Sequence, residues 1–224
     1  MSKENLAIWN AVSETDPAYT KKVNQRGGFT TIDAQYQLMN ATKEFGPYGK
    51  SWGFKDIDLD YTLIDKCLVI FKGVFFFPGG QFPIINCKSI GDKKIDEDFA
   101  KKLETNTLSK ALSKLGFNAD IFMGKFEDID YVNSAITKSE IKKADDEGET
   151  VEKALQELEA WVVQEVETYR MLPSITALDP VYSTHRKKID LRCMALNISA
   201  ESIIKRFDAA YFERKNELES GRAA

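Results

Sequence analysis

Apolar residues repeat at two different periods along this chain, and the changes of period mark its elements. Between residues 33 and 45 apolar side chains recur every three or four positions, which predicts a helix with one apolar face. Asp33 is placed to cap this helix and Gly46 to end it. A shorter helix is predicted over Lys3–Glu14, and a short strand over Phe29–Ile32.

Three runs rich in aromatic and β-branched residues follow, over residues 52–61, 67–77 and 81–90. Short connections join them, one of them the turn Pro78-Gly79-Gly80, so the runs predict an antiparallel sheet. Lys93–Phe117 is then predicted to form one long helix that crosses the sheet. The fold class expected is therefore α+β, with a strand-strand-strand-helix core.

The pattern changes again in the last third of the chain. Residues 138–149 are charged and include a glycine, which is typical of a linker or a frayed helix end. From Val151 to Tyr169 apolar residues recur at helical spacing, Pro173 ends that helix, and residues 183–195 and 200–218 predict two more. We therefore expect one domain over 1–138, followed by a charged linker and an acidic helical region over 139–224.

The predicted long helix carries polar side chains along one stripe. Lys102, Asn106, Ser109, Lys110 and Ser113 fall on it, and leucines and an alanine occupy the opposite side. Ammonium groups and short donors in a row can hold a phosphate backbone without reading bases. The alternative is a solvated helix face, which is the usual role of such lysines.

Three segments form one combined pattern: the strand and helix of Gly28–Gly46, the aromatic Trp52 after that helix, and the helix-containing stretch Thr105–Tyr131. Together they resemble the Rad fifty-two type of single-strand DNA annealing protein, most closely its bacteriophage relatives. The last segment reads TNTLSKALSKLGF at its start, similar to the family's threonine, polar, leucine, basic, alanine-leucine, glycine helix. The resemblance covers roughly residues 18–135.

The resemblance implies a non-enzymatic protein that binds single-stranded DNA and anneals complementary strands in recombination and repair, without ATP, cofactor or metal. It also implies a ring or helical homo-oligomer, encoded by a phage and acting in the host cytoplasm. The C-terminal helices would cover the core or bind a partner, such as a neighbouring subunit or a single-strand-binding protein. The DNA-binding residues implied lie in the basic loop Tyr19–Gly28 and on the long helix: Lys21, Lys22, Arg26, Lys102, Ser109, Lys110, Ser113 and Lys114.

The charge of the chain restricts how it could bind DNA. The net charge is −4, with 18 basic and 18 acidic residues over 1–138 and 13 against 17 over 139–224. A neutral domain binds DNA only if its lysines converge on one surface.

The chain has no run of 18 apolar residues and no secretory signal at its start. Its three cysteines lack close pairs, so we expect a cytoplasmic protein with reduced thiols.

Other residues of the chain offer alternatives to annealing. Asp56, Asp58 and Asp60 alternate on one strand, which could place them on one face as a nuclease metal site or as a solvated, guarded edge. The stretch Gly46–Ser51 lacks the spacing of a phosphate-binding loop, and His185, expected at a helix surface, is the only histidine. Trp52, Phe54 and Phe75–Phe77 are expected in the core or a subunit interface more than against bases. A third possibility is an adaptor that binds no DNA.

Overall fold

The computed structural model describes residues 3–24, 28–60, 68–90 and 96–221. The chain divides into two compact units, unit 1 with Met1–Thr15 and Tyr19–Lys125 and unit 2 with Asp16–Ala18 and Phe126–Ala224. The α+β class is confirmed, but the division lies before the predicted boundary at residue 138. Residues 126–138 therefore belong with the C-terminal helices.

Unit 1 begins with short helical elements, η1 (Lys3–Leu6) and α1 (Ala7–Val12), within the segment predicted as a helix. The segment predicted as a basic loop instead contains a strand, β1 (Thr20–Val23), after the turn η2 (Pro17–Tyr19). β1 pairs in antiparallel fashion with the predicted short strand, β2 (Phe29–Ile32). The alternation that defines β1 is too short to be recognised among polar residues, so only the pairing with β2 reveals it.

The helix α2 (Ala34–Phe45) confirms both of its predicted ends. The Asp33 carboxyl accepts hydrogen bonds from the backbone N–H of Gln35 at 2.8 Å and of Tyr36 at 3.2 Å. Gly46 follows the helix at φ 91°, a backbone conformation that favours glycine. Its carbonyl accepts a 2.8 Å bond from the Trp52 indole, which ties the helix end to the start of the sheet.

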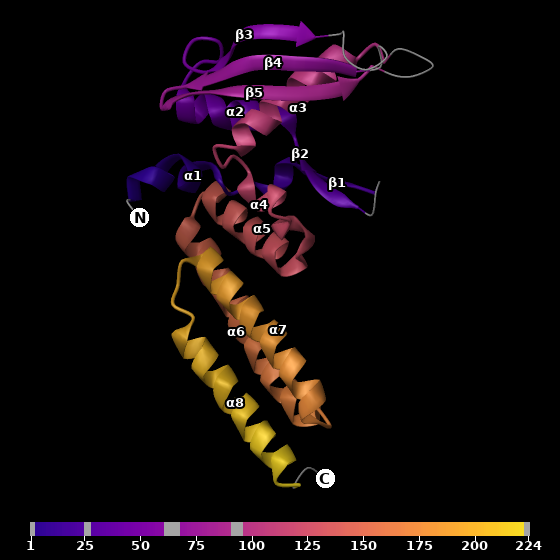
Figure 1. The fold of residues 1–224 in the computed structure, drawn as a ribbon. Helices are drawn as coiled ribbons and strands as arrows, with labels where there is room; N and C mark the ends of the chain where they lie inside the picture. The colour runs from indigo at the N-terminus through magenta and orange to yellow at the C-terminus, as the bar shows by residue number, and fades with distance from the viewer. Residues whose placement is uncertain (1–2, 25–27, 61–67, 91–95, 222–224) are drawn as a thin grey trace. The chain divides into compact units, whose positions relative to one another are not determined.

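The sheet has the predicted antiparallel order, β3 (Gly53–Asp60), β4 (Leu68–Phe77) and β5 (Gly80–Ser89). Figure 1 shows α2 and the helix α3 (Phe99–Ser113) on the same side of it. The register between β3 and β4 shifts between Lys55 and Asp58, and Asp56 there has a φ of 53°. This shift is a β-bulge, with two residues of β3 opposite one of β4.

The long helix is shorter than predicted. Of its expected first residues, 93–95 lie outside the described residues, and α3 itself runs only from Phe99 to Ser113. Gly116, at φ 96°, closes the end, with the Trp9 ring so near that a Cβ there would lie 2.6 Å from it. The short elements α4 (Ala119–Phe122) and η3 (Lys125–Glu127) follow. The core between sheet and helices is built on large buried side chains, among them Phe45, Trp52, Phe75, Leu112 and Phe117.

Unit 2 is helical: α5 (Ile129–Lys143), α6 (Glu147–Met171), α7 (Ile175–Leu196) and α8 (Glu201–Glu219). Residues 138–149, predicted as a linker or a frayed helix end, contain the end of α5 at Lys143 and the start of α6 at Glu147. A full linker is therefore wrong, since only a short break capped by Asp146 separates the two helices. The apolar side chains of the four helices of unit 2 form a core of their own.

His185 is not at a helix surface, as the sequence predicted, but half-buried among aromatic rings of α6 and α8. Within the described residues, no helix combines the length and apolar character that crossing a bilayer requires.

Candidate nucleic-acid interface

The candidate site lies where α3 runs beside the edge strand β5. Three contacts join the two elements: Asn86 donates to the Thr107 hydroxyl at 3.1 Å, the Lys110 ammonium donates to the Ile85 carbonyl at 2.7 Å, and the Lys114 ammonium lies 5.3 Å from the Phe82 ring centre. Residue numbers rise along α3 as they fall along β5, so the two elements run in opposite directions. Lys110 and Lys114 are exposed along this seam.

The other end of the seam carries two more lysines and an acidic partner. Lys102 donates to both carboxyl oxygens of Asp96 at 2.9 Å, and this bond lowers the pKa of Asp96 and raises that of Lys102. The charge of Lys88, on β5, also lowers the pKa of Asp96. We call Lys88, Lys102, Lys110 and Lys114 the lysine row. Lys88 was missed from the sequence because its place beside the helix depends on how α3 lies along β5.

Two predicted residues of the same helix face inward or toward their own backbone. Ser109 is half-buried and donates its hydroxyl to the Gln37 side-chain oxygen on α2. Ser113 donates to the backbone carbonyl of Lys110 at 3.0 Å. Ser109 is therefore placed in the interior of unit 1 and not in the lysine row.

Ser109 ends a chain of buried polar side chains that sequence reasoning did not find. Gln37 donates to Asn118 at 3.2 Å, and Asn118 donates to the Thr15 hydroxyl at 2.9 Å. Thr15 in turn donates to Asp120 through its backbone N–H at 2.7 Å and its hydroxyl at 2.6 Å. Apart from Ser109, each of these side chains belongs to a residue less than 5% exposed. The network fixes α3 against α2 and the N-terminal segment, and so sets the direction in which the lysine row points.

The basic segment predicted as a loop is a hairpin in the structure. Lys21 and Lys22 are both exposed on β1, and Arg26 lies outside the described residues. α2 connects this hairpin to the lysine row. The Tyr36 ring on α2 stacks on Tyr19, just before β1, and Gln37, next along α2, contacts Ser109.

The aromatic residues of the sheet are core residues, as the first expectation had it. Trp52 and Phe75 are fully buried, and Phe54 and Phe77 pack against the same core. Phe76 is half-buried and points to the opposite face of β4 from Phe75.

The aspartates proposed as an alternative metal site are separated by the bulge in β3. Asp58 pairs with Lys72 and Asp60 with Ile70, whereas Asp56 lies inside the bulge, so strict alternation does not hold across the three. Asp60 is held by the Lys72 ammonium at 3.0 Å. Nowhere in the described part of the chain do three or more His, Cys, Asp or Glu side chains gather as metal ligands would.

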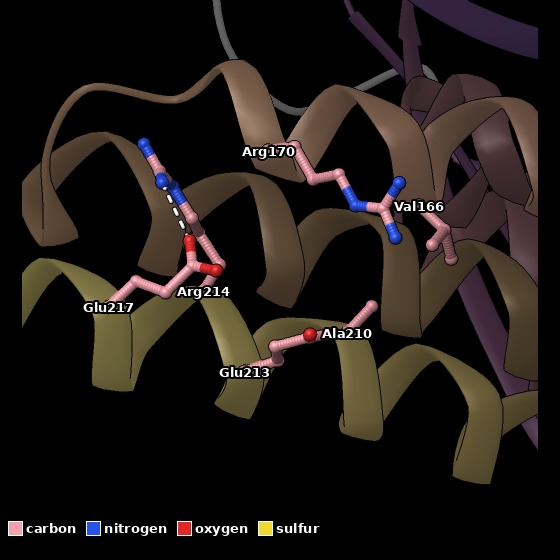
Figure 2. Close-up of a pocket in the computed structure, with 6 residues that line it drawn as sticks. All are labelled: Val166, Arg170, Ala210, Glu213, Arg214 and Glu217. Atoms are coloured by element: carbon pink, nitrogen blue, oxygen red, sulfur yellow. Dashed lines mark hydrogen bonds and ion pairs between the residues drawn. The ribbon is translucent and has the colours of Figure 1, made fainter. Parts of the chain in front are cut away.

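A shallow hollow lies between α6 and α8 in unit 2 (Figure 2). Arg214 lines it, but its guanidinium donates to the Leu172 carbonyl at 2.8 Å and to Glu217 at 2.8 Å. Arg170, also lining it, pairs with Glu167 at 2.9 Å. The Arg214 bond holds the end of α6 to α8, and both arginines have partners within unit 2.

The structural boundary changes the charge argument made from the sequence. Unit 1 contains 17 Lys and Arg against 14 Asp and Glu, a net of +3, and unit 2 contains 14 against 21, a net of −7. The difference from the neutral count over 1–138 comes from residues 126–138, with a net charge of −2, and from Asp16, all of which belong to unit 2. The unit that carries the lysine row is therefore net basic.

Comparison with protein-family models gives no match for this chain, and comparison with curated proteins gives none either. The resemblance to single-strand annealing proteins stays a prediction, carried by the residues quoted for it.

Proposed function

We propose that this protein binds single-stranded DNA along the lysine row and anneals complementary strands without ATP. The observation that carries the proposal is the seam between α3 and β5, where Lys110 and Lys114 contact β5 and Lys88 and Lys102 lie by Asp96, on a net basic unit. The stretch from Lys102 to Lys114, the residue after α3, is about 18 Å long at 1.5 Å per residue. A row of this length can contact several successive phosphates.

The chemistry of such a row suits annealing. Ammonium groups neutralise phosphates without distinguishing bases, so binding is independent of sequence and falls as salt rises. Two strands repel each other through their phosphates, and neutralising one of them lowers that barrier. A strand held by its backbone leaves its bases available for pairing.

The resemblance extends the proposal to the protein's setting. It favours a homo-oligomer, a ring or helical filament, that works in phage recombination within the host cytoplasm. The net charge of −7 on unit 2 makes these helices a poor DNA contact and a reasonable contact for a basic protein surface, either on a neighbouring subunit or on a single-strand-binding protein.

Annealing of two complementary labelled oligonucleotides, followed by fluorescence quenching, tests the proposal. We expect the purified protein to accelerate annealing equally with and without ATP and Mg²⁺, and to leave both strands intact. An absolute need for ATP would contradict the proposal. Strand cleavage that appears only with Mg²⁺ would instead support a nuclease, and no binding to single strands would support an adaptor.

A further inference from the structure

The β1–β2 hairpin presents one face that combines an aromatic ring with a lysine. The register pairs Lys21 with Thr31 and Val23 with Phe29, and residues two apart on a strand share a face, so these four side chains lie together. Phe29 is 44% exposed, whereas its neighbour Thr30, on the other face, is only 9% exposed. Phe29 and Lys21 are therefore exposed on one face of the hairpin, and Thr30 is covered on the other.

This front is carried by an anchored element. The backbone N–H of Asp33 donates to the Tyr19 carbonyl at 2.9 Å, which closes the base of the hairpin. Tyr19 stacks on Tyr36 of α2, with ring centres 4.3 Å apart and planes 13° apart, and β2 lies against α4. Phe29 is therefore held in the open on a strand whose base is fixed to the body of unit 1.

Charge identifies the occupant of this face. Residues 19–32 contain Lys21, Lys22 and Arg26 and no acidic residue, a net charge of +3. Of the three, Lys21 shares the face of Phe29, Lys22 lies on the other face of β1, and Arg26 lies outside the described residues. An exposed phenylalanine beside a lysine, in a segment without acidic residues, matches an unpaired nucleotide, which offers an aromatic base and a phosphate. The acidic unit 2 of a second copy would match the charge of this segment, but only a nucleotide also offers a flat aromatic base to the exposed ring.

We propose that this face of the hairpin is a base-stacking site for single-stranded DNA, with the Phe29 ring against an unpaired base and the Lys21 ammonium on the adjacent phosphate. The site rests on the proposed function, to which it adds a contact with the bases themselves. Stacking occupies the π-face of a base and leaves its hydrogen-bonding edge open. A base held in this way can still pair with a second strand, so the contact is compatible with annealing.

The test compares two ligands and three variants of the full chain by fluorescence anisotropy. The ligands are a labelled oligothymidine and an abasic oligomer of the same length, which keeps the phosphates and lacks the bases. The variants are Phe29→Leu, which keeps an apolar side chain without a π-face, Phe29→Trp, which keeps the ring, and Phe122→Leu as the control. Phe122 is a comparable aromatic residue of unit 1, 55% exposed on α4.

We expect Phe29→Leu to bind oligothymidine about 5-fold to 100-fold more weakly than wild type, since stacking on one base is worth that much. The two proteins should bind the abasic oligomer equally, and Phe122→Leu should match wild type on both ligands. Phe29→Trp should keep its affinity and show indole quenching by oligothymidine beyond that of the wild-type tryptophans.

Unchanged binding of Phe29→Leu to oligothymidine, or an equal loss on the abasic oligomer, would overturn the stacking site while leaving annealing through the lysine row intact. Wild-type protein that binds neither ligand would overturn both proposals. Because Phe29 is exposed, all variants should keep the wild-type thermal unfolding transition, and that measurement confirms that the comparison concerns folded protein.

Discussion

Ser109 and Lys110 are neighbours on α3, yet one side chain is bonded inside unit 1 and the other is exposed. The Ser109 hydroxyl closes a buried hydrogen-bond chain through Gln37, and the Lys110 ammonium lies exposed at the β5 edge. Consecutive helical residues point about 100° apart, since a turn holds 3.6 residues. One position is thus committed to the fold while the next is available for a ligand.

Replacing both Lys110 and Lys114 by alanine should weaken binding to single strands by a similar factor for every sequence. A phosphate contact carries no base information, and each one lost should lower the slope of log affinity against log salt by roughly 0.7 for a single strand. Titrations of several oligonucleotides over a salt series measure both effects. A matched control is Lys43→Ala with Lys55→Ala, which makes the same charge change at exposed lysines of α2 and of β3, the opposite edge of the sheet from β5. An altered base preference, or an unchanged salt slope, would contradict the assignment of the lysine row.

Asp120→Ala should destabilise unit 1 by about 2–3 kcal/mol. The Asp120 carboxyl accepts from the Thr15 backbone N–H, the Thr15 hydroxyl and the Ile121 N–H, and the residue is 3% exposed. Removing it leaves buried donors without an acceptor, which costs more than the net value of the bonds. Urea unfolding of the variant, compared with an exposed Asp98→Ala control, gives the difference in free energy. Equal stability of the two variants would show that the network contributes little.

Among the elements, the edge strands of the sheet are better protected than the sequence suggests. On β5, Pro83 removes a backbone donor from the exposed side, and Lys110 covers the Ile85 carbonyl. On β3, the bulge at Asp56 interrupts the regular edge. Such features discourage indiscriminate strand pairing, so any contact between subunits at these edges must be a specific one.

In the C-terminal helices, His185 connects α7 to its neighbours. Its ring lies against Trp161 and Tyr169 of α6 and Phe207 of α8, with ring centres 5.2 to 5.9 Å away. Burial lowers the pKa of His185, and the nearby Glu165 carboxyl only partly offsets this. The neutral imidazole is therefore the form that fits the fold.

Unit 2 should lose stability as the pH falls from 7.5 to 5.5. The folded-state pKa of His185 lies below the ordinary value of 6.5, so the unfolded chain takes up the proton more readily. The stability that the neutral ring contributes is present above pH 6.5 and is lost on acidification. Thermal melts at the two pH values should show a smaller difference for His185→Phe, which keeps an aromatic ring without the titration. The Asp128 carboxyl, whose pKa the Lys187 hydrogen bond lowers, affects only a more acidic range.

An equal pH dependence in wild type and His185→Phe would contradict the role of the imidazole. The comparison concerns the change between pH values and not the absolute melting temperature. If His185→Phe is less stable than wild type at both pH values, the comparison still shows whether His185 causes the pH dependence.

At the scale of the whole molecule, the boundary between units 1 and 2 determines which fragment keeps an intact folding unit. A fragment of residues 1–138 ends inside α5 and loses the 2.8 Å bond from Ser134 to the Leu191 carbonyl. Residues 1–125 should bind single-stranded DNA as tightly as the full chain or more tightly at low salt, because the acidic unit 2 is gone. Proteolysis of the 1–138 fragment should trim it back toward Lys125. A folded 1–125 fragment that fails to bind would contradict the assignment of DNA binding to unit 1.

Light scattering at micromolar concentration should give one discrete mass, several times the 25.4 kDa of the chain. The three-stranded sheet has two edge strands, β3 and β5, and a closed ring of subunits satisfies such edges without open-ended growth. The 1–125 fragment should assemble in the same way if the contact lies within unit 1. A monomer at this concentration would refute assembly.

Local features of the sequence predicted much of the element plan. The Asp33 cap, the Gly46 stop, the three antiparallel strands and the amphipathic helix of 151–169 all depend on residues close in sequence. A cap or a short turn is formed by neighbouring atoms, so its signal can be read without knowing the rest of the fold.

The site depended on contacts between residues far apart in sequence. A helical period shows that α3 has two faces, but the packing against β5 and α2 decides that Lys88 joins the lysine row and that Ser109 turns inward. The strand β1, too weak to recognise alone, exists through its pairing with β2, and that pairing exposes Phe29. The sequence by itself determined most of the elements, β1 excepted, because their signals are local. Only the tertiary structure decided which side chains meet, because that depends on how separate elements pack.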